Sequence, residues 1–246
     1  MRYLILSDIH ANREALEAVL ADAEGRYDQI LCAGDLVDYG ADPNAVVDWA
    51  RQSVAAVVRG NHDKACAGLD DIEWFHPAAR ASALWTRKAL TEENLEYLRG
   101  LPQGPLSIGD FQIMHGSPAD EDEYMVSFPD VQRLCTGLEQ QVSFFGHTHL
   151  QGGFFWRGTN YAGIDQTPPG AGESIVEFPA GCYGMINPGS VGQPRDGDPR
   201  AAYVVYSPEE KVFFYRRVVY NVREAQRKIL NASLPPQFAN RLAVGA

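Results

Sequence analysis

Residues 3–10 of the chain read YLILSDIH, an apolar run of four residues that passes into a carboxylate and an imidazole. Such a short apolar run is typical of a buried parallel strand. Because side chains two residues apart in an extended chain point the same way, we expect Asp8 and His10 to share one metal ion. The same arrangement recurs after the apolar residues 142–145, where His147 and His149 are again two residues apart.

Two more polar residues follow apolar runs at regular distances along the chain. Only one glycine separates Asp35 from the apolar run at residues 29–33. Asn61 comes shortly after the apolar run at residues 54–58. Asp8 and Asp35 are 27 residues apart, and Asp35 and Asn61 are 26 apart. One strand–helix–strand unit takes roughly 30 residues. Polar side chains therefore recur at the carboxyl ends of successive parallel strands, where open α/β sheets place their sites.

Five of the six histidines lie within five short motifs whose residue types bind metal, and only His76 lies outside them. The motifs are Asp8-Ile9-His10, Gly34-Asp35, Gly60-Asn61-His62-Asp63, His115-Gly116 and Gly146-His147-Thr148-His149. Taken singly, such an aspartate is more often a helix cap or turn residue, and such a histidine a polar contact. Five motifs in order at strand ends instead indicate two adjacent metal pockets, the usual apparatus for in-line displacement at phosphorus.

In this order, Asp-x-His, Gly-Asp-x-x-Asp, Gly-Asn-His-Asp, His-Gly and Gly-His-Thr-His resemble the motifs of the calcineurin-like metallophosphoesterases. A later stretch, residues 186–195 (INPGSVGQPR), resembles the small bacterial and archaeal phosphodiesterases of that superfamily. The resemblance implies an α/β fold in which a two-sheet β-sandwich is flanked by helices. It also implies a dinuclear metal site at the carboxyl ends of the strands.

The resemblance further implies how the ligands divide between two divalent metal ions. The seven ligands would be Asp8, His10 and His149 for the first ion, Asn61, His115 and His147 for the second, and Asp35 as a bridge. This mixture of imidazole, carboxylate and amide ligands argues against a structural zinc site, which closes with thiolates and imidazoles. Mn²⁺ is the expected metal, with Fe, Zn and Ni as alternatives.

Two residues beside the ligands are expected to handle the proton of the leaving group. In the family, the histidine that matches His62 protonates the leaving oxygen while a metal-bound hydroxide attacks phosphorus. Asp38 lies where relatives place a carboxylate that orients this histidine, and its negative charge would favour the imidazolium. The alternative for Asp38 is a helix-capping or loop acid ahead of Asp42.

Two arginines are candidate phosphate-binding residues, because a guanidinium offers a fork of donors to phosphate oxygens. Arg59 precedes the Gly-Asn-His motif, as in the Arg-Gly-Asn-His of the protein serine/threonine phosphatases. Those enzymes have an arginine where this chain has Tyr39 and a glutamate where it has Asp63, which weakens that assignment. Arg195 follows the Gly-Gln-Pro stretch, and its alternative is an ion pair with one of the two aspartates that follow it.

The expected function is hydrolysis of phosphate esters, by a phosphodiesterase or nucleotide phosphohydrolase acting on a small phosphorylated substrate. One alternative is activity like that of a serine/threonine protein phosphatase. Another is a non-catalytic protein-interaction scaffold, because some members of the superfamily have lost metal ligands. Such scaffolds show gaps in the ligand set, and this chain shows none.

Composition limits the setting and the partners. The net charge of −11 argues against a broad basic surface for nucleic acid. The first residues do not resemble a signal peptide, and no apolar run approaches membrane-spanning length. Four cysteines without a CxxC pair suggest reduced thiols in the cytoplasm. We expect one domain over residues 1–246, and the sequence assigns no oligomeric state.

The remaining pattern predicts the secondary structure around these motifs. Helices are expected over residues 11–24, 43–51, 78–88, 92–100 and 129–139, and from an Asn221 cap to about Ile229. Hairpins are expected around Gly109-Asp110 and around residues 208–210. The tail from Ser233 shows little helical pattern and is expected to pack as an arm or to fray.

Two stretches, residues 64–80 and 157–173, lack a regular pattern, and loops of that length in a compact domain are commonly functional. Four aromatic residues either stack on a substrate ring or, as the favoured alternative, pack in the ordinary way: Trp74, Phe75, Trp85 and Tyr124. His76 either touches substrate or is simply a loop histidine before Pro77.

Overall fold

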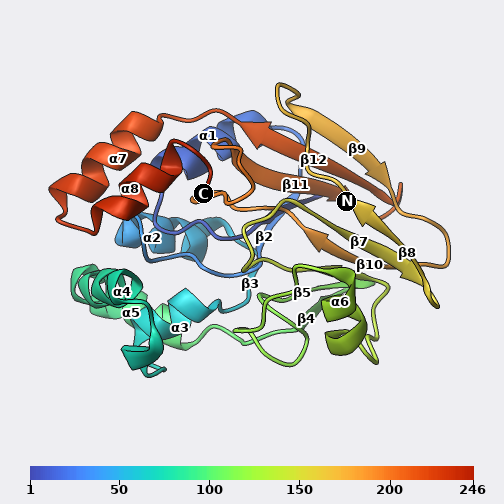
Figure 1. Cartoon of the computed structure of the whole chain (residues 1–246), viewed down its shortest axis with the longest axis horizontal. Coiled ribbons are helices and arrows are strands. Elements are labelled where there is room, and N and C mark those ends of the chain that lie inside the picture. Colours follow the sequence, from blue (N-terminus) through green and yellow to red (C-terminus); the bar gives the residue numbers. More distant parts are fainter.

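The chain folds into two six-stranded sheets packed face to face with helices on their outer sides, in a computed structural model that describes residues 1–246 except the side chain of Trp74 (Figure 1). The first sheet contains, in order, β3 (Ala56–Val57), β2 (Gln29–Cys32), β1 (Tyr3–Leu6), β11 (Ala201–Ser207), β12 (Val212–Val218) and β9 (Glu173–Glu177). The second contains β4 (Leu106–Ile108), β5 (Phe111–Ile113), β6 (Val142–Phe144), β10 (Tyr183–Asn187), β7 (Gly152–Arg157) and β8 (Asn160–Ile164). The expected sandwich of two sheets flanked by helices is confirmed.

Each sheet contains three neighbouring parallel strands, which bring their carboxyl ends together. In the first sheet β1 and β2 run parallel, with Leu6 opposite Cys32, and β2 and β3 run parallel with Cys32 opposite Val57. In the second sheet β5 and β6 run parallel, with Ile113 opposite Phe144. Every loop that leaves these strand ends therefore starts at the same edge of the sandwich.

Helices cover the outer face of each sheet. They are α1 (Arg13–Ala23), α2 (Pro43–Ser53), α3 (Asn61–Ala67), α4 (Pro77–Ala89), α5 (Glu92–Arg99), α6 (Phe128–Leu134), α7 (Val222–Asn231) and α8 (Pro236–Leu242), with a 3₁₀ turn at Ile72–Trp74. In Figure 1, α6 lies by the second sheet and the other helices lie to the side of the first. No helix in the described part of the chain has both the length and the apolar character needed to cross a membrane.

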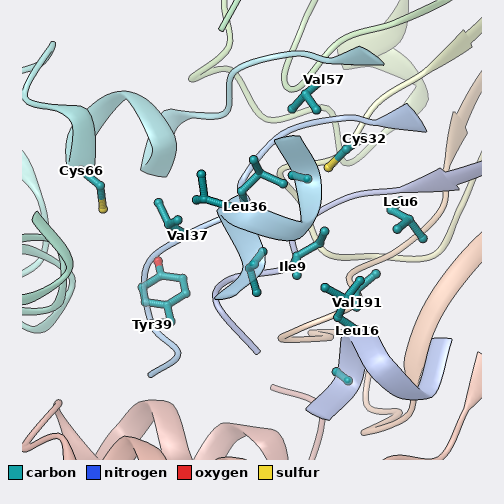
Figure 2. Close-up of a cluster of buried hydrophobic side chains, with 14 of the residues drawn as sticks. Leu6, Ile9, Leu16, Cys32, Leu36, Val37, Tyr39, Val57, Cys66 and Val191 are labelled. Carbon is teal, nitrogen blue, oxygen red and sulfur yellow. The ribbon is translucent and has the colours of Figure 1, made fainter. Parts of the chain in front are cut away.

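Alternation along β1 divides the apolar core into two main layers. Leu4 and Leu6 face the helices and join a cluster with residues of α1, α2 and α8, whereas Ile5 faces the second sheet and packs with Phe144. Period-two alternation of this kind is what a strand buried on both faces requires. Figure 2 shows part of the helix-side cluster, in which Cys32 is a buried apolar contact rather than a ligand.

Most expected elements are present, and four expectations were wrong, the fourth being the tail from Ser233. The hairpin around Gly109 forms between β4 and β5, and Asn221 caps α7 by accepting a hydrogen bond from the Glu224 amide. The helix expected over residues 129–139 ends at Leu134. Residues 157–173 are not one long loop, because β7 and β8 pair across a tight turn at Gly158. Residues 64–80 hold the end of α3, the 3₁₀ turn and the start of α4.

The tail from Ser233 does not fray but forms α8. Proline at the start of this helix supplies a fixed φ where no amide partner is needed. Phe238 and Leu242, four residues apart, lie on one face of the helix and are buried. Seven helical residues are too few to show a clear periodicity, so tertiary packing decides this structure.

Replacing Phe238 by alanine tests whether this packing holds the C-terminal segment. The side chain is 1% exposed and its ring lies 4.5 Å from that of Tyr39. We expect Phe238→Ala to lower the free energy of unfolding by about 3–5 kcal/mol, measured by urea denaturation. Asn240→Ala, at an exposed position of the same helix, is the control and should change it little. If Phe238→Ala changes the free energy of unfolding as little as Asn240→Ala does, α8 adds no stability.

Candidate metal centre

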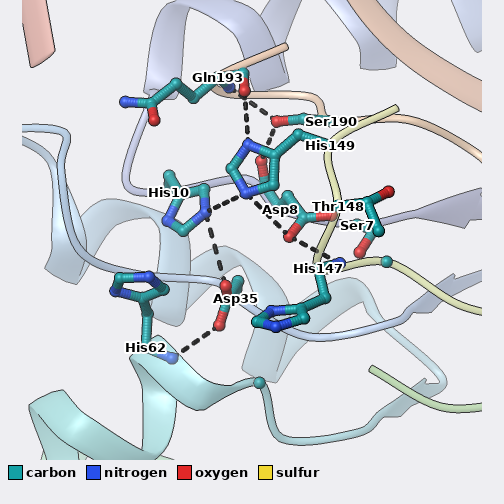
Figure 3. Close-up of polar contacts among 12 residues, drawn as sticks. Ser7, Asp8, His10, Asp35, His62, His147, Thr148, His149, Ser190 and Gln193 are labelled. Carbon is teal, nitrogen blue, oxygen red and sulfur yellow. Dashed lines mark hydrogen bonds and ion pairs between the residues drawn. The ribbon is translucent and has the colours of Figure 1, made fainter. Parts of the chain in front are cut away.

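The seven expected ligands lie in loops that leave the carboxyl ends of five strands. They are Asp8 and His10 after β1, Asp35 after β2, Asn61 after β3, His115 after β5, and His147 and His149 after β6. The structure brings all seven to one edge of the sandwich, and six of them are buried, with Asn61 partly so. Figure 3 shows how five of them face one another across this edge.

The ligand loops have a left-handed backbone, so the expected extended geometry for Asp8 and His10 was wrong. φ is +53° at Asp8, +49° at His10 and +57° at Asp35, and it is also positive at His147 and His149. Backbone hydrogen bonds hold these turns, among them Asp8 N to Gly34 O at 3.0 Å and His10 N to Asp35 O at 3.0 Å. A left-handed residue other than glycine costs about 1–2 kcal/mol, and such strain concentrates at functional sites.

Each ligand histidine has one ring nitrogen bound to a backbone carbonyl. The four contacts are His10 Nδ1 with Val37 O at 3.0 Å, His115 Nδ1 with Ala33 O at 2.8 Å, His147 Nε2 with Asp122 O at 3.2 Å and His149 Nδ1 with Gln193 O at 2.5 Å. A carbonyl oxygen only accepts, so in every case the ring nitrogen donates. That contact fixes the tautomer and leaves the lone pair of the other nitrogen free for a metal, as in known metal sites.

The carboxylates lie against the free nitrogens. Asp8 Oδ1 is 3.3 Å from His149 Nε2, and Asp35 Oδ2 is 3.5 Å from His10 Nε2 and 3.3 Å from His115 Nε2. Two groups of potential ligand atoms result, one with Asp8, His10, Asp35 and His149 and one with Asp35, His115 and His147. Asp35 belongs to both groups.

Three observations show that this arrangement fits cations. His10 Nε2 and His149 Nε2 are 3.1 Å apart although both rings donate through Nδ1, so two lone pairs face each other. Asp8 Oδ2 and Asp35 Oδ2 are buried and accept no hydrogen bond among the described residues. Burial lowers the pKa of His10, which favours the neutral ring that binds metal. Positive charge between these atoms would satisfy all of them.

His115 and His147 illustrate how strongly the carboxylates favour positive charge. Burial acts against a charged His115, but Asp35 outweighs it and raises the pKa of His115 to about 10. Burial, together with the charge of His115, lowers the pKa of His147 to about 3. His147 is thus neutral at neutral pH, the form in which an imidazole binds metal. A cation bound between the carboxylates would take over the charge that the His115 proton supplies.

Asp63 holds the Asp35 loop in place. In the sequence it stood out only as a difference from the protein phosphatases. Its two carboxylate oxygens accept from four backbone amides: Asp35 N at 2.8 Å, Leu36 N at 2.8 Å, Val37 N at 3.2 Å and Gly60 N at 3.1 Å. Position 60 requires glycine, because a Cβ there would lie 2.1 Å from Asp35 Oδ1. The sequence placed Asp63 in the Gly-Asn-His-Asp motif but gave no sign of these backbone contacts.

Residues 186–195 hold the loops of the expected ligands through hydrogen bonds. Asn187 Nδ2 donates to Gly146 O and to Thr148 Oγ1, both at 3.0 Å, which holds the His147–His149 loop. Ser190 Oγ donates to Asp8 O at 2.8 Å. This stretch therefore positions ligands on both sheets and supplies the Gln193 carbonyl that binds His149.

His62 lies next to the metal ligands without belonging to either ligand group. Its Nδ1 donates to Asp38 Oδ2 at 2.7 Å, and its Nε2 is 2.9 Å from the Tyr39 hydroxyl. Burial lowers the pKa of His62, but Asp35 and Asp38 outweigh it and raise that pKa above its usual value. Asp38 caps no helix, since Asp42 holds the N-cap position of α2, so the alternative role of Asp38 as a helix cap was wrong.

The two candidate arginines differ in their surroundings. Arg59 forms an ion pair with the buried Glu121 at 2.9 Å, so its guanidinium is already engaged. Arg195 forms neither of the expected alternative ion pairs, because Asp196 pairs with Arg217 and Asp198 with Arg200. Its Nε is buried without a hydrogen-bond partner among the described residues. The Arg195 guanidinium lies 6.0 Å from the Tyr39 ring.

Aromatic residues pack around the site rather than standing free. The Tyr124 ring, which is half exposed, stacks on His147 at 3.9 Å, and Phe75 lies edge-on to His62 at 5.5 Å. Trp85 packs partly buried against the helix-side core. The side chain of Trp74 lies outside the described residues. The contact of Tyr124 with a ligand histidine was not predicted, since it depends on a long loop returning to the site.

Comparison with known proteins agrees with this geometry. The model of the calcineurin-like phosphoesterase superfamily domain matches residues 1–211. The chain is 31% identical to the uncharacterized protein MJ0912 of Methanocaldococcus jannaschii over 245 residues, which is 98% of this chain and 97% of that protein.

Two solved structures resemble the whole chain. A metallophosphoesterase from Sphaerobacter thermophilus superimposes with a TM-score of 0.87 at 37% identity, covering 100% of this chain and 99% of that one. The hypothetical protein PH1004 from Pyrococcus horikoshii OT3 shares the fold, with a TM-score of 0.77, 20% identity and coverage of 100% and 98%. A family match over residues 1–211 and a relative similar along its full length mean that this chain belongs to the calcineurin-like phosphoesterase superfamily.

Proposed function

We propose that the protein is a two-metal hydrolase of phosphodiesters or nucleotides. The observation that carries the proposal is Asp35, a buried carboxylate shared by both groups of potential metal ligands. Asp8, His10 and His149 would hold one divalent ion with it, and Asn61, His115 and His147 would hold the other. Asn61 suits this role because its Oδ1 is 3.1 Å from His115 Nε2. Mn²⁺ is the proposed metal, with Fe, Zn and Ni as alternatives.

When bound, the two ions would neutralise the phosphate oxygens and lower the pKa of a water molecule. A residue of the chain must then donate a proton to the leaving group. His62 is the proposed acid, because Asp38 holds its Nδ1 at 2.7 Å and its Nε2 is 2.9 Å from the Tyr39 hydroxyl. Asp38 would orient the ring and favour its charged form. Arg195, whose Nε has no partner, is proposed to bind substrate oxygens.

Small phosphorylated substrates are favoured over phosphoproteins. Tyr39 stands where the protein phosphatases have an arginine, and the Arg59 that resembles theirs is paired with Glu121. Protein phosphatase-like activity is therefore the second candidate. A non-catalytic scaffold is the least favoured, because six of the seven expected ligands form two clusters and the seventh, Asn61, lies 3.1 Å from His115. The net charge of −11 also argues against nucleic acid as a substrate.

Metal analysis tests the dinuclear site. Protein dialysed against Mn²⁺ should hold two ions per chain. Asp35→Asn should weaken both ions together, whereas Asp8→Asn should weaken one, because Asp8 belongs to a single ligand group. Asp38→Asn, a buried acid nearby that faces His62, is the matched control and should keep both ions. One ion per chain in the wild type, or full metal content in Asp35→Asn, would contradict a bridging carboxylate.

Kinetics with different leaving groups test the role of His62. His62→Asn should keep the metal content and slow the hydrolysis of substrates with alcohol leaving groups by about 10²- to 10⁴-fold, the usual effect of losing a general acid. The loss should be much smaller for p-nitrophenyl esters, because p-nitrophenolate leaves without a proton. If both kinds of substrate slow equally, His62 instead binds or positions the phosphate.

Turnover of bis-p-nitrophenyl phosphate tests the substrate class. The Mn²⁺-loaded protein should hydrolyse it, and a chelator should abolish the reaction because the carboxylates and imidazoles alone do not activate water. Nucleotides should also be cleaved, and phosphoserine peptides should be poorer substrates. Phosphopeptide hydrolysis that is orders of magnitude faster than that of every diester and nucleotide would reverse this ranking in favour of the protein phosphatases.

A further inference from the structure

A cavity of about 250 Å³ lies beside His62 and outside the two ligand groups. Its wall is built from segments far apart in the sequence. The lining includes Tyr39, His76, Arg195, Phe238, Arg241 and Ala246. The loop after β2, the start of α4, the 186–195 stretch and α8 all meet there. Figure 2 shows Tyr39 between α3, which carries Cys66, and the C-terminal helices below it.

Among the described residues, two arginines and no acidic side chain line the cavity, and the one carboxylate at its wall is the α-carboxylate of Ala246. Arg195 and Arg241 form no ion pair among the described residues, although most arginines of this acidic chain do. The nearest recorded partner of the Arg195 guanidinium is the Gln193 side chain, at 3.5 Å. Arg241 lies over the Phe238 ring at 5.8 Å, which holds it at the wall. No aspartate or glutamate lines the cavity among the described residues.

His76, the histidine outside the five motifs, adds a further polar group. It is the N-cap of α4, where its Nδ1 accepts from the Ala78 amide at 3.4 Å. Since Nδ1 accepts there, Nε2 carries the proton and is a donor at the cavity wall. Two guanidinium groups and one imidazole donor from three separate segments therefore surround one space. Such a set of donors suits a phosphate group, to which guanidinium groups bind through paired hydrogen bonds.

The place of the cavity relative to His62 decides which part of a substrate reaches it. Tyr39 is shared, because it lines the cavity and its hydroxyl is 2.9 Å from His62 Nε2. Arg195 also connects the cavity with the candidate metal site. It lines the cavity, and its backbone amide donates to the carbonyl of His149 at 3.2 Å. An acid protonates the leaving oxygen, so the leaving group lies on the His62 side of the phosphorus. The atoms that follow that oxygen would enter the cavity.

We propose that the cavity bounded by Arg195, Arg241 and His76 binds a second phosphate group carried by the leaving group of the substrate. The inference rests on the proposed phosphohydrolase function and narrows its substrates to those in which the departing portion is itself phosphorylated. Nucleoside polyphosphates that release pyrophosphate, and esters of phosphorylated alcohols, belong to this class. The reaction stays hydrolysis: water adds to phosphorus, the phosphorus–oxygen bond breaks, and the leaving oxygen takes a proton.

Equilibrium binding to the metal-free protein tests the cavity independently of turnover. In the metal-free protein phosphate cannot bind to a metal ion, so the part of inorganic phosphate binding, measured by calorimetry, that the arginine substitutions remove reports on the cavity. Arg241→Gln and Arg195→Gln should each weaken it by on the order of tenfold. Arg80→Gln is the matched control, because Arg80 is an exposed arginine of α4 that forms no recorded ion pair and does not line the cavity. Absent binding, or binding insensitive to both cavity substitutions, would overturn the proposal.

Kinetics of the Mn²⁺-loaded protein then distinguish a phosphate on the leaving group from free phosphate. Thymidine 5′-triphosphate and the p-nitrophenyl ester of thymidine 5′-monophosphate both yield thymidine 5′-monophosphate. The first releases pyrophosphate, and the second releases p-nitrophenol. Arg241→Gln should lower kcat/KM for the triphosphate at least tenfold more than for the ester, and Arg80→Gln should leave the ratio unchanged. An unchanged ratio in Arg241→Gln would make the cavity a site for free phosphate and overturn the leaving-group assignment.

The two experiments also separate failure of this inference from failure of the proposed function. A protein that binds phosphate through Arg195 and Arg241 but hydrolyses none of the esters keeps the anion site and loses the hydrolase assignment, and with it the leaving-group role. A protein that hydrolyses esters but binds no phosphate in the cavity keeps the function and loses the inference. Thermal unfolding of each variant shows whether the fold is retained.

Discussion

The buried carboxylate of Asp35 is the group on which the rest of the site depends. It lies among His10, His62 and His115, and it is the one residue common to both groups of potential metal ligands. Its Oδ1 accepts from the His62 amide at 2.9 Å, while Oδ2 has no hydrogen bond among the described residues. Moving a charge out of water costs several kcal/mol unless it is compensated. The surrounding fold must therefore hold both the charge and the groups that compensate it.

The neighbouring backbone provides part of that compensation at the expense of local strain. Asp63 fixes the Asp35 loop by accepting from four amides, and the positive φ angles at Asp8, His10 and Asp35 turn the side chains inward. Each left-handed residue costs about 1–2 kcal/mol. Loops this strained persist only because strands on both sides and the 186–195 stretch determine them. Metal binding would return some of this cost, since a ligand at 100 times its Kd stabilises the folded state by about 2.7 kcal/mol.

The sequence predicted which polar residues lie together better than it predicted the backbone that holds them. Asp8, His10 and Asp35 were found because metal chemistry restricts residue types and because strand ends repeat along the chain. The assumed extended backbone at Asp8 was wrong, since left-handed turns are set by long-range hydrogen bonds such as that from Asp8 N to Gly34 O. The structure of α8 could not be foreseen either, because its seven residues gain their stability from packing against Tyr39 and not from helical propensity.

Charge distribution explains how an acidic protein can serve an anionic substrate. The net charge of −11 repels phosphate at a distance, yet the carboxylates that contribute to it at the site are buried and would be neutralised by metal ions. On the far side of His62, Arg195 and Arg241 add positive charge close to the same space. Because surface charges are screened over about 8–10 Å in salt, these local groups outweigh the distant acids. With metal ions bound as proposed, His62 would lie between two positive regions, where an acid could reach the bond between two phosphorylated halves of a substrate.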